Sequence, residues 1–454
     1  MNEREWYRLD NASNIFLATQ NEIDTKVFRL SAEMTEKVEP ELLQMALNTT
    51  YEEYTLFHST LRRGYFWYYL ERSEVNPRVK FETDPPVSPI YQSGRRNFLF
   101  RVLYRENRIH LEVFHALTDG TGALWFFEDL LTEYVKLKHL ENEEHPSLKI
   151  KREKENLEDS FNRYFRKEDS LALDRFTRPF KLFSHSNVEE KASAQKFFPR
   201  PLEQQIDEKV YQIKGTKTAD HRPRIINLDL PLKKTLELAR AENVSLTIYL
   251  TALYVLSVYM TSKEQRKETT ISVSIPINLR QFFPSVTVRN FFSTTKVAYT
   301  FKKTEEPSLS KICQELDQQF QKKLEKEALE NRLRKLIDYE YNPAARIILR
   351  PIKDLVLKVI NQLNNRKITG AMSNLGRVDL PKQISPYVKD FNFYTSVIRP
   401  QFCMISYRNQ LNVTFTSPYT ETNIVQWFVR YLTQKGLEVS IDVNKVTREE
   451  LQEL

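Results

Sequence analysis

The sequence predicts an α/β protein built from two lobes. Three observations lead to this fold class. Helical and strand patterns alternate in the first third of the chain, the same mixture returns from about residue 225, and a long stretch without a sustained period lies between them. We therefore expect an N-terminal lobe at 1–140, a crossover at 141–224 and a C-terminal lobe at 225–454. With 454 residues, 41% of them hydrophobic, the chain can form two sizeable cores.

The elements of the N-terminal lobe follow from side-chain spacing. Pro40 stands at a first helical position, and apolar side chains follow it at helical intervals as far as Tyr54. From Ile109 to His115, every second residue faces the same side of a predicted strand. The predicted elements are a helix over 40–54, two strands around a turn at 62–64 that include the aromatic run 65–69, a hairpin of strands 98–102 and 109–115, and a helix over 123–137.

The C-terminal lobe repeats this mixture with longer helices. Leu246 to Met260 is apolar on all sides, which predicts a buried helix. Strands are predicted at 225–230, 270–277, 295–301, 368–373, 388–394, 402–408, 410–416 and 437–441. Helices are predicted at 232–241, 246–260, 308–336, 344–363 and 421–432.

Glycine is scarce, with 8 in 454 residues, whereas an average usage of about 7% would give roughly 32. Loops that cradle phosphate need closely spaced glycines. The densest pair is Gly120 and Gly122, and Ala123 follows where a dinucleotide fingerprint would continue. The sequence therefore excludes the P-loop and dinucleotide-binding classes.

Charge and cysteine content restrict the partners and the compartment. The net charge of +8 indicates anionic partners such as phosphorylated cofactors, acidic carrier proteins or lipid head groups, and it is too diffuse to indicate nucleic acid. Cys313 and Cys403 supply neither a disulfide framework nor a cysteine zinc site, so we expect a cytoplasmic protein. Charged residues at the start replace the apolar run of a signal peptide, and 246–260 is shorter than the about 20 residues that span a bilayer.

The sharpest local pattern is Phe114-His115-Ala116-Leu117-Thr118-Asp119-Gly120, between an apolar strand and an apolar helix. A histidine at the end of a strand can face a cleft, while a carboxylate four residues later fastens the loop. Histidine is also the side chain best suited to proton abstraction near neutrality. Taken alone, a strand histidine is more often a hydrogen-bonded core residue.

The motif resembles the HxxxDG signature of the CoA-dependent acyltransferase superfamily, which includes chloramphenicol acetyltransferase, condensation domains, wax ester synthases and alcohol acetyltransferases. Many members have HHxxxDG, and here Phe114 stands at the first position, which weakens the match to condensation domains. Two further segments are similar to family segments in type and order: 275–280 followed by 289–293, and Ser373-Asn374-Leu375-Gly376. The opening residues 7–12 also resemble bacterial alcohol-acetyltransferase-like proteins.

The resemblance implies two chloramphenicol-acetyltransferase-like lobes, each with a mostly antiparallel mixed sheet and flanking helices, and an active-site channel between them. His115 is implied as the general base that activates an acceptor hydroxyl or amine for direct attack on a thioester. Asp119 is implied as structural, with Arg280 as the matching ion-pair partner. An exposed surface cation is the other interpretation of Arg280.

Several residues are candidates for stabilising the oxyanion or contacting substrate. A backbone amide at Gly120, the Ser373 hydroxyl and the Asn374 amide are possible donors. Ser373, Asn374 and Gly376 are equally typical of a turn, and Asn290 is read as turn or tunnel lining. Gly120, Gly122, Gly370 and Gly376 are predicted to let the backbone approach substrate. No metal ligands and no bound cofactor are predicted.

The expected partners are acyl-CoA as co-substrate and an alcohol or amine acceptor. An acyl carrier protein is the alternative donor, and we expect a monomer. The basic amphipathic segment 346–367 could meet CoA phosphates, a carrier protein or a membrane surface, although a solvated polar face over a core stripe is the more ordinary interpretation.

Two other classes of protein fit the sequence less well than an acyltransferase. A noncatalytic two-lobed binding protein fits poorly with the joint presence of His115, Asp119, Gly120 and Arg280. Hydrolases are disfavoured because neither GxSxG nor HExxH occurs in the sequence.

Overall fold

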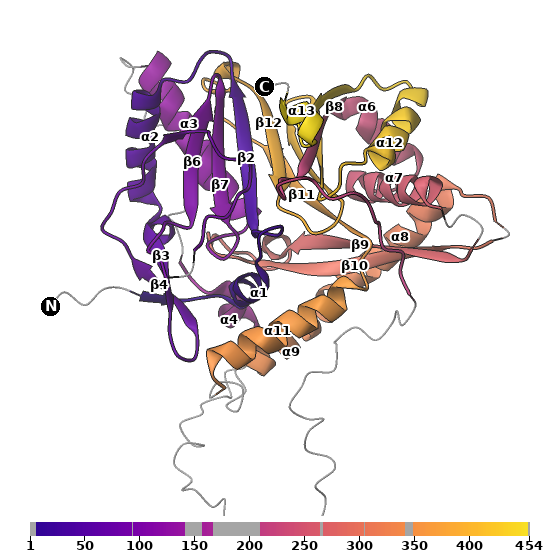
Figure 1. Ribbon diagram of the computed structural model, residues 1–454, viewed down its shortest axis with the longest axis horizontal. Helices are drawn as coiled ribbons and strands as arrows, with labels where there is room; N and C mark the ends of the chain where they lie inside the picture. The colour runs from indigo at the N-terminus through magenta and orange to yellow at the C-terminus, as the bar shows by residue number, and fades with distance from the viewer. Residues whose placement is uncertain are drawn as a thin grey trace, which may run out of the picture.

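The computed structural model describes residues 6–92, 94–140, 157–166, 209–263, 267–303, 305–340 and 348–452. The protein is a mixed α/β structure with two lobes side by side, as the sequence predicts (Figure 1). Most of the predicted crossover at 141–224 lies outside the described residues. Each lobe has its own hydrophobic core.

A five-stranded sheet in the order β12-β2-β7-β6-β5 forms the N-terminal lobe. Neighbouring strands are antiparallel except for β5 and β6. The strands are β2 (Val27–Met34), β5 (Lys80–Phe81), β6 (Phe100–Arg105), β7 (Arg108–Phe114) and β12 (Val388–Thr395). The helices α2 (Pro40–Glu53) and α3 (Gly120–His139) pack together on the same core. This arrangement puts the end of β7 and the start of α3 next to each other.

One strand of this sheet comes from the C-terminal half of the chain. The strand β12 pairs with β2 along its whole length, from Val388 opposite Met34 to Thr395 opposite Phe28. Its apolar residues Phe391 and Phe393 belong to the N-terminal core. The predicted boundary at residue 225 places 388–394 in the second lobe, but the strand crosses back to complete the first.

A seven-stranded sheet in the order β10-β9-β11-β13-β14-β8-β15 forms the C-terminal lobe. The strand β11 is parallel to both neighbours, and the other pairs are antiparallel. The strands are β8 (Arg224–Pro231), β9 (Thr269–Asn278), β10 (Phe292–Phe301), β11 (Gly370–Val378), β13 (Gln401–Tyr407), β14 (Gln410–Ser417) and β15 (Ser440–Val443). The helices are α6 (Leu232–Ala241), α7 (Leu246–Thr261), α8 (Leu309–Leu324) and α12 (Asn423–Gln434). The apolar helix α7 is buried, as its sequence predicts.

The remaining elements lie around the junction of the lobes and on the surface. They are β1 (Trp6–Arg8), β3 (Ser59–Arg63) and β4 (Tyr68–Arg72) in a small sheet, the helices α1 (Asn11–Thr19), α4 (Ser160–Phe165), α9 (Lys326–Glu340), α11 (Arg350–Asn365) and α13 (Arg448–Gln452), and the 3-10 turns η1 (Thr55–His58), η3 (Leu279–Gln281) and η4 (Ser385–Tyr387). Within the described chain no single helix is long and apolar enough to cross a membrane; α6 and α7 qualify only as a pair, with a bend of 79° between them.

Three local predictions differ from the structure. The aromatic residues Tyr65, Phe66 and Trp67 form the exposed tip of the β3–β4 hairpin instead of a strand. The predicted helix 308–336 is divided at Glu325, because α8 packs in the C-terminal core whereas α9 packs in a third cluster with α4. The apolar stripe of the predicted helix 344–363 faces solvent, and no side chain of α11 is buried. Residues 341–347, including Arg346, lie outside the described part of the chain.

Candidate active site

A cavity of about 230 Å³ lies between the two lobes. One wall comes from β2, the end of β7 and the start of α3, with Phe28, His115 and Gly120. The opposite wall comes from β9, β10 and β11, with Phe292 and Ser373. The cavity therefore combines aromatic side chains, a titratable imidazole and hydroxyl groups.

The backbone and three aromatic rings hold His115 in place at the end of β7. Its backbone N–H donates to the Lys26 carbonyl oxygen over 2.8 Å. The imidazole stacks on Phe16 of α1 with ring centroids 4.2 Å apart. It meets the edge of Phe28 at 5.1 Å, and the Phe292 ring lies 5.4 Å away. Burial lowers the pKa of His115, so the neutral imidazole is favoured.

The side-chain amide of Asn290 determines which imidazole nitrogen carries the proton. Asn290 Nδ2 donates to the His115 carbonyl oxygen over 3.1 Å, and a carbonyl can only accept. The amide oxygen Oδ1 therefore faces His115 Nδ1, 3.2 Å away, and accepts its N–H. In a neutral imidazole this leaves Nε2 with a free lone pair, which is the state of a general base.

Asp10 and Ser13 support this amide from α1. Asp10 caps the helix by accepting from the Ser13 backbone N–H over 2.9 Å. Its other oxygen accepts from Asn290 Nδ2 over 3.1 Å. One carboxylate thus anchors both α1, which carries Phe16, and the amide that orients His115.

The Asp119 carboxylate lies close to His115 in sequence but is fully engaged in structural contacts. Arg280 Nη1 lies 2.7 Å from Asp119 Oδ2, and both side chains are buried. The same oxygen accepts from the Phe291 N–H, and Oδ1 caps α3 by accepting from the Gly122 N–H over 3.0 Å. Arg280 Nη2 also donates to the carbonyl oxygens of Thr287 and Arg289, over 2.8 Å each. Arg280 is not an exposed surface cation.

The other candidates are only partly brought together. Gly120, Ser373 and Asn374 line the cavity. Gly376 is not part of the lining; it has a positive φ of 88° in a bulge of β11, where its N–H donates to Asn374 Oδ1. Asn290 is buried behind His115 and is not part of the cavity lining, because its amide fills the space between His115 and Asp10. The expectation that Asn290 lines a tunnel or contacts substrate does not match this position.

The glycines near the site serve different purposes. Only Gly120, of the four glycines singled out in the sequence, is part of the cavity lining. A Cβ at Gly122 would lie 2.4 Å from the Val288 carbonyl oxygen, and one at Gly370 would lie 2.5 Å from the Tyr254 hydroxyl. At these two positions the close neighbour is protein, not the cavity.

The family assignment rests on the sequence itself. The profile of the alcohol acetyltransferase family matches residues 103–423, which include His115, Asp119, Arg280 and Ser373. This chain belongs to the alcohol acetyltransferase family. It is therefore an acyltransferase, as the sequence predicts.

Solved structures share the fold of this chain over nearly its whole length. Polyketide synthase associated protein 5 from Mycobacterium tuberculosis is 11% identical with a TM-score of 0.58, covering 94% of this chain and 96% of that chain. The TRI3 trichothecene 15-O-acetyltransferase from Fusarium sporotrichioides is 11% identical with a TM-score of 0.59, covering 94% of each chain. The first condensation domain of the CDA synthetase is 13% identical with a TM-score of 0.57, covering 95% of each chain. No curated protein sequence matches this chain.

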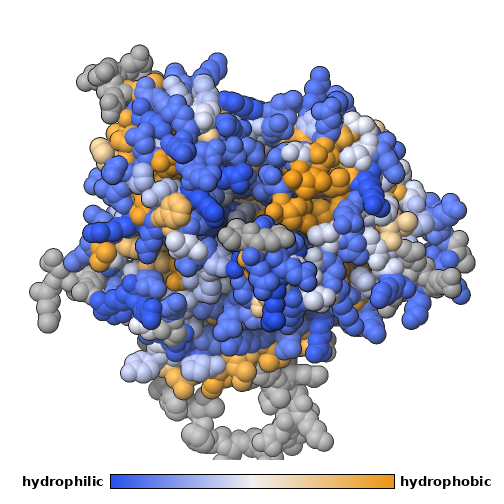
Figure 2. All heavy atoms as spheres, turned by 45° about the horizontal axis from the view of Figure 1, so that its top comes forward, coloured by the Kyte–Doolittle hydropathy of each residue, from blue (hydrophilic) through white to orange (hydrophobic). Residues whose placement is uncertain are grey.

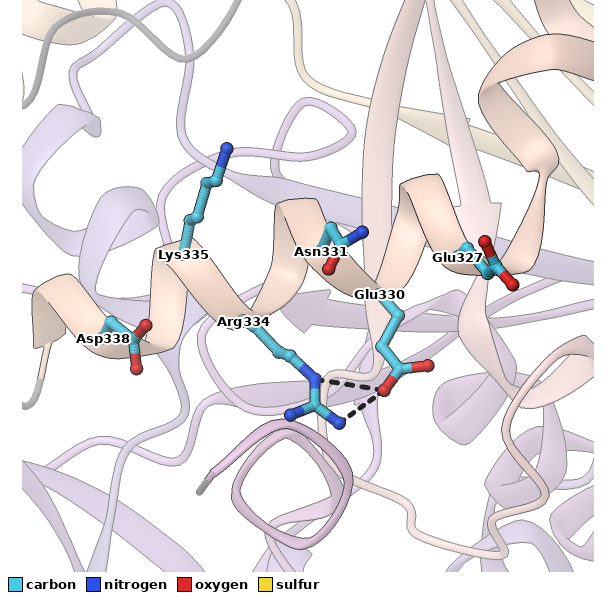
Figure 3. A pocket seen from close by; sticks show the side chains of 6 residues that line it. All are labelled: Glu327, Glu330, Asn331, Arg334, Lys335 and Asp338. Carbon is cyan, nitrogen blue, oxygen red and sulfur yellow. Dashed lines mark hydrogen bonds and ion pairs between the residues drawn. The ribbon is translucent and has the colours of Figure 1, made fainter. Parts of the chain in front are cut away.

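A second hollow, of about 570 Å³, lies beside α9 (Figure 3). Its lining comes from that helix alone and is polar or charged: Glu327, Glu330, Asn331, Arg334, Lys335 and Asp338. Arg334 donates to Glu330 one turn away, over 3.0 Å from Nε. The cavity at His115 is the stronger candidate for the active site, because residues of both lobes meet there around an imidazole. Within the described residues, no group of three or more His, Cys, Asp or Glu side chains is placed to hold a metal ion.

The supporting role of Asn290, Asp10 and Ser13 was missed in the sequence. Asp10 followed by Ser13 before an apolar run is a typical helix start, so this pattern could have revealed α1. Nothing in the sequence relates those residues to position 290, since the contact depends on how the two lobes meet.

Proposed function

We propose that this protein transfers an acyl group from a CoA thioester to the hydroxyl group of an alcohol, with His115 as the general base. The observation that carries the proposal is the hydrogen bond between His115 Nδ1 and Asn290 Oδ1. It leaves Nε2 as the basic nitrogen of an imidazole that lines the cavity between the lobes.

The reaction follows from this arrangement in two steps. The acceptor hydroxyl gives its proton to His115 Nε2 while its oxygen attacks the thioester carbonyl, and the carbonyl electrons move onto oxygen. The tetrahedral intermediate then collapses, the carbon–sulfur bond breaks, and the departing sulfur takes the proton from His115. The products are an ester and free CoA thiol, and no acyl-enzyme forms.

Ser373 is the side chain best placed to stabilise the oxyanion. It lines the cavity from the lobe opposite His115. Asn374 is less available, because its Oδ1 accepts from Gly376 and its Nδ2 donates to Thr247 over 3.0 Å. The backbone at Gly120 is a second donor, since the first N–H groups of a helix have no acceptor within the helix. One well-aimed donor contributes about 3 to 4 kcal/mol in the transition state.

The choice of donor and acceptor rests on the family and on structural relatives. The starter condensation domain of rhizomide synthetase, which shares this fold, has been solved with C8-CoA. The TRI3 relative is an O-acetyltransferase. The net charge of +8 suits a phosphorylated donor such as CoA. A carrier-protein thioester is the alternative donor that the assay has to distinguish.

The test follows release of free thiol from acetyl-CoA and longer acyl-CoA thioesters with a panel of alcohols and amines. His115→Ala should lower the rate about 100-fold or more, because general-base catalysis typically contributes that much. His139→Ala is the matched control: His139 ends α3, roughly 30 Å along the helix from Gly120, and stacks on Tyr387. A folded His115→Ala variant with the wild-type rate would refute the mechanism. Turnover only with acyl carrier protein would reassign the donor.

A further inference from the structure

The helix α11 presents its apolar stripe to solvent. Ile352, Leu355, Val359 and Leu363 recur at helical spacing and are between 49% and 62% exposed. Within the described chain no residue of this helix is buried. Soluble helices normally place such a stripe against a core, so this surface is built to be covered by something else.

The tip of the β3–β4 hairpin extends the same surface. Tyr65 is 86% exposed, and Phe66 and Trp67 are exposed as well. The first turn of α11 is fastened to this tip, since the Arg350 N–H donates to the Tyr65 carbonyl oxygen over 3.0 Å. Lys353 Nζ donates to the Phe66 carbonyl oxygen over 3.2 Å and lies 6.0 Å from the centre of the Trp67 ring. The helix and the tip therefore form one continuous face.

Cationic side chains accompany the apolar stripe. Segment 350–367 holds five of them, Arg350, Lys353, Lys358, Arg366 and Lys367, and a single carboxylate, Asp354. That carboxylate is occupied within the protein, because it accepts from the Tyr68 hydroxyl over 2.9 Å and lies 3.8 Å from Arg350 Nε. Lys358 and Arg366 are exposed. The face thus combines apolar, aromatic and positive groups.

We propose that α11 and the hairpin tip Tyr65–Trp67 form a membrane-docking face for the surface of an anionic lipid bilayer. An apolar stripe flanked by Lys and Arg on a single helix is the composition of a helix that lies in the interface, and Trp and Tyr are the residues that prefer head-group depth. In Figure 1, α11 crosses the outside of the molecule below β9 and β10, and apolar atoms gather along this lower edge in Figure 2. With 16 residues the helix is about 24 Å long, which suits lying in the interface and is too short to span it.

One helix, α1, connects the docking face to the proposed reaction centre at His115. The helix α11 packs against α1. In α1, Ile15 is exposed, while the next residue, Phe16, stacks on His115. Docking would therefore bring the membrane to the side of the molecule from which α1 reaches the base. This position suits an enzyme that draws apolar substrates from a bilayer, but the docking itself does not depend on the reaction.

Binding to vesicles tests the proposal with the full chain. We expect it to cosediment with vesicles of phosphatidylcholine mixed with phosphatidylglycerol, more weakly with phosphatidylcholine alone, and less as salt is raised. Leu355→Ser with Val359→Ser should reduce the partition coefficient about tenfold or more, because two apolar side chains no longer enter the lipid. Trp67 emission should shift to the blue on binding, and Trp67→Phe should remove that shift.

Two control variants make the result specific. Ile441→Ser with Val443→Ser removes a similarly exposed apolar pair from β15 and should leave vesicle binding unchanged within about twofold. Lys358→Gln with Arg366→Gln should weaken binding to the anionic vesicles and leave binding to the neutral ones unchanged. Unfolding temperatures of all variants show whether they fold.

Four outcomes would overturn the proposal. The first is that the protein does not bind anionic vesicles, and the second is that the folded Leu355/Val359 variant binds them as well as the wild type does. The third is that the wild type is a dimer which this variant converts to a monomer. The fourth is that an acidic carrier protein binds this face while vesicles do not. The third would show that a second copy covers the stripe, and the fourth that the face recognises a protein.

Discussion

Asn290 Oδ1 lies 3.2 Å from His115 Nδ1, across the junction of the two lobes. His115 follows a strand of the N-terminal sheet, whereas Asn290 precedes β10 of the C-terminal sheet. The orientation of the His115 imidazole is therefore a property of the assembled pair of lobes. A shift of one lobe against the other would alter the tautomer as well as the shape of the cavity.

Replacing Asn290 should impair catalysis without removing the base. In Asn290→Ala, Nδ1 loses its acceptor, so the proton can move to Nε2 and the lone pair leaves the substrate side. We expect kcat to fall about 10- to 100-fold with a small change in KM, since only the proton transfer is affected. The measurement is steady-state kinetics together with nitrogen NMR of labelled histidine, with His115→Gln to assign the signal.

A second variant separates orientation from folding. Asn290→Asp keeps an oxygen facing Nδ1, so the Nδ1–H tautomer should persist, while the added negative charge should raise the pKa of His115. If Asn290→Ala retained both the wild-type tautomer and the wild-type kcat, Asn290 would have no positioning role.

The pH dependence of the reaction should reflect the buried imidazole. Burial lowers the pKa of His115, and the base works only when it is neutral. The rate should therefore rise with pH through an apparent pKa below the ordinary value of about 6.5 and stay level at and above neutrality. The measurement is kcat/KM against pH with an alcohol acceptor. An inflection above pH 7 in the wild-type protein would contradict this assignment.

The same shift affects stability. The unfolded chain takes up a proton on this histidine at a higher pH than the folded protein does. The contribution of His115 to the free energy of unfolding is therefore present above about pH 6.5 and is lost as the pH falls below it. The loss should be missing in His115→Ala.

The ion pair between Asp119 and Arg280 should be structural. Both side chains are buried, so Arg280→Met leaves a buried carboxylate without its cation, and this typically costs about 3 to 5 kcal/mol in the free energy of unfolding. Because Asp119 also caps α3, activity should fall with stability. Chemical denaturation measures the effect, and the double variant Arg280→Met with Asp119→Asn should recover part of it.

An exposed ion pair provides the comparison. Arg163 and Glu158 lie 2.8 Å apart, with the Arg163 side chain exposed and the Glu158 side chain partly exposed. Arg163→Ala should leave the free energy of unfolding nearly unchanged, because solvent screens an exposed ion pair. A similar small loss in Arg280→Met would mean that the buried pair has no structural role.

Local patterns in the sequence were sufficient for much of the fold. Helical spacing and strand alternation predicted α2, α3, α7 and the β6–β7 hairpin, because each has a face or a whole surface buried in one core. The motif at His115 pointed to the cavity through its resemblance to the HxxxDG signature, because a histidine at the end of an apolar strand can face a cleft.

Features that depend on long-range contacts could not be predicted in this way. The pairing of β12 with β2 joins Val388 to Met34, and no local pattern encodes such a partner. Asparagine is a common turn residue, so the sequence around Asn290 indicates only a turn. The role of Asn290 depends on its hydrogen bonds to Asp10 and His115, which are distant in the sequence. The apolar stripe of α11 has the spacing of a core helix. In the structure α11 packs against α1, and the stripe faces solvent.

Asp390 should make the stability of the lobe junction depend on pH. It lies on β12, and burial together with the nearby Asp229 of β8 raises its pKa to about 7. The folded protein therefore holds a proton that the unfolded chain releases above its ordinary pKa of about 3.9. Because the folded state binds more protons in this window, the free energy of unfolding falls as the pH rises from about 4 to about 7 and then stays level.

Asp390→Asn removes this cost, so it should raise the unfolding temperature by more at pH 8 than at pH 4.5. The control is Asp338→Asn on the exposed surface of α9, which should show no such difference. Thermal unfolding of both variants over this range measures the effect. An equal shift for Asp390→Asn at both pH values would mean that the carboxylate is not held in its protonated form at the junction of the lobes.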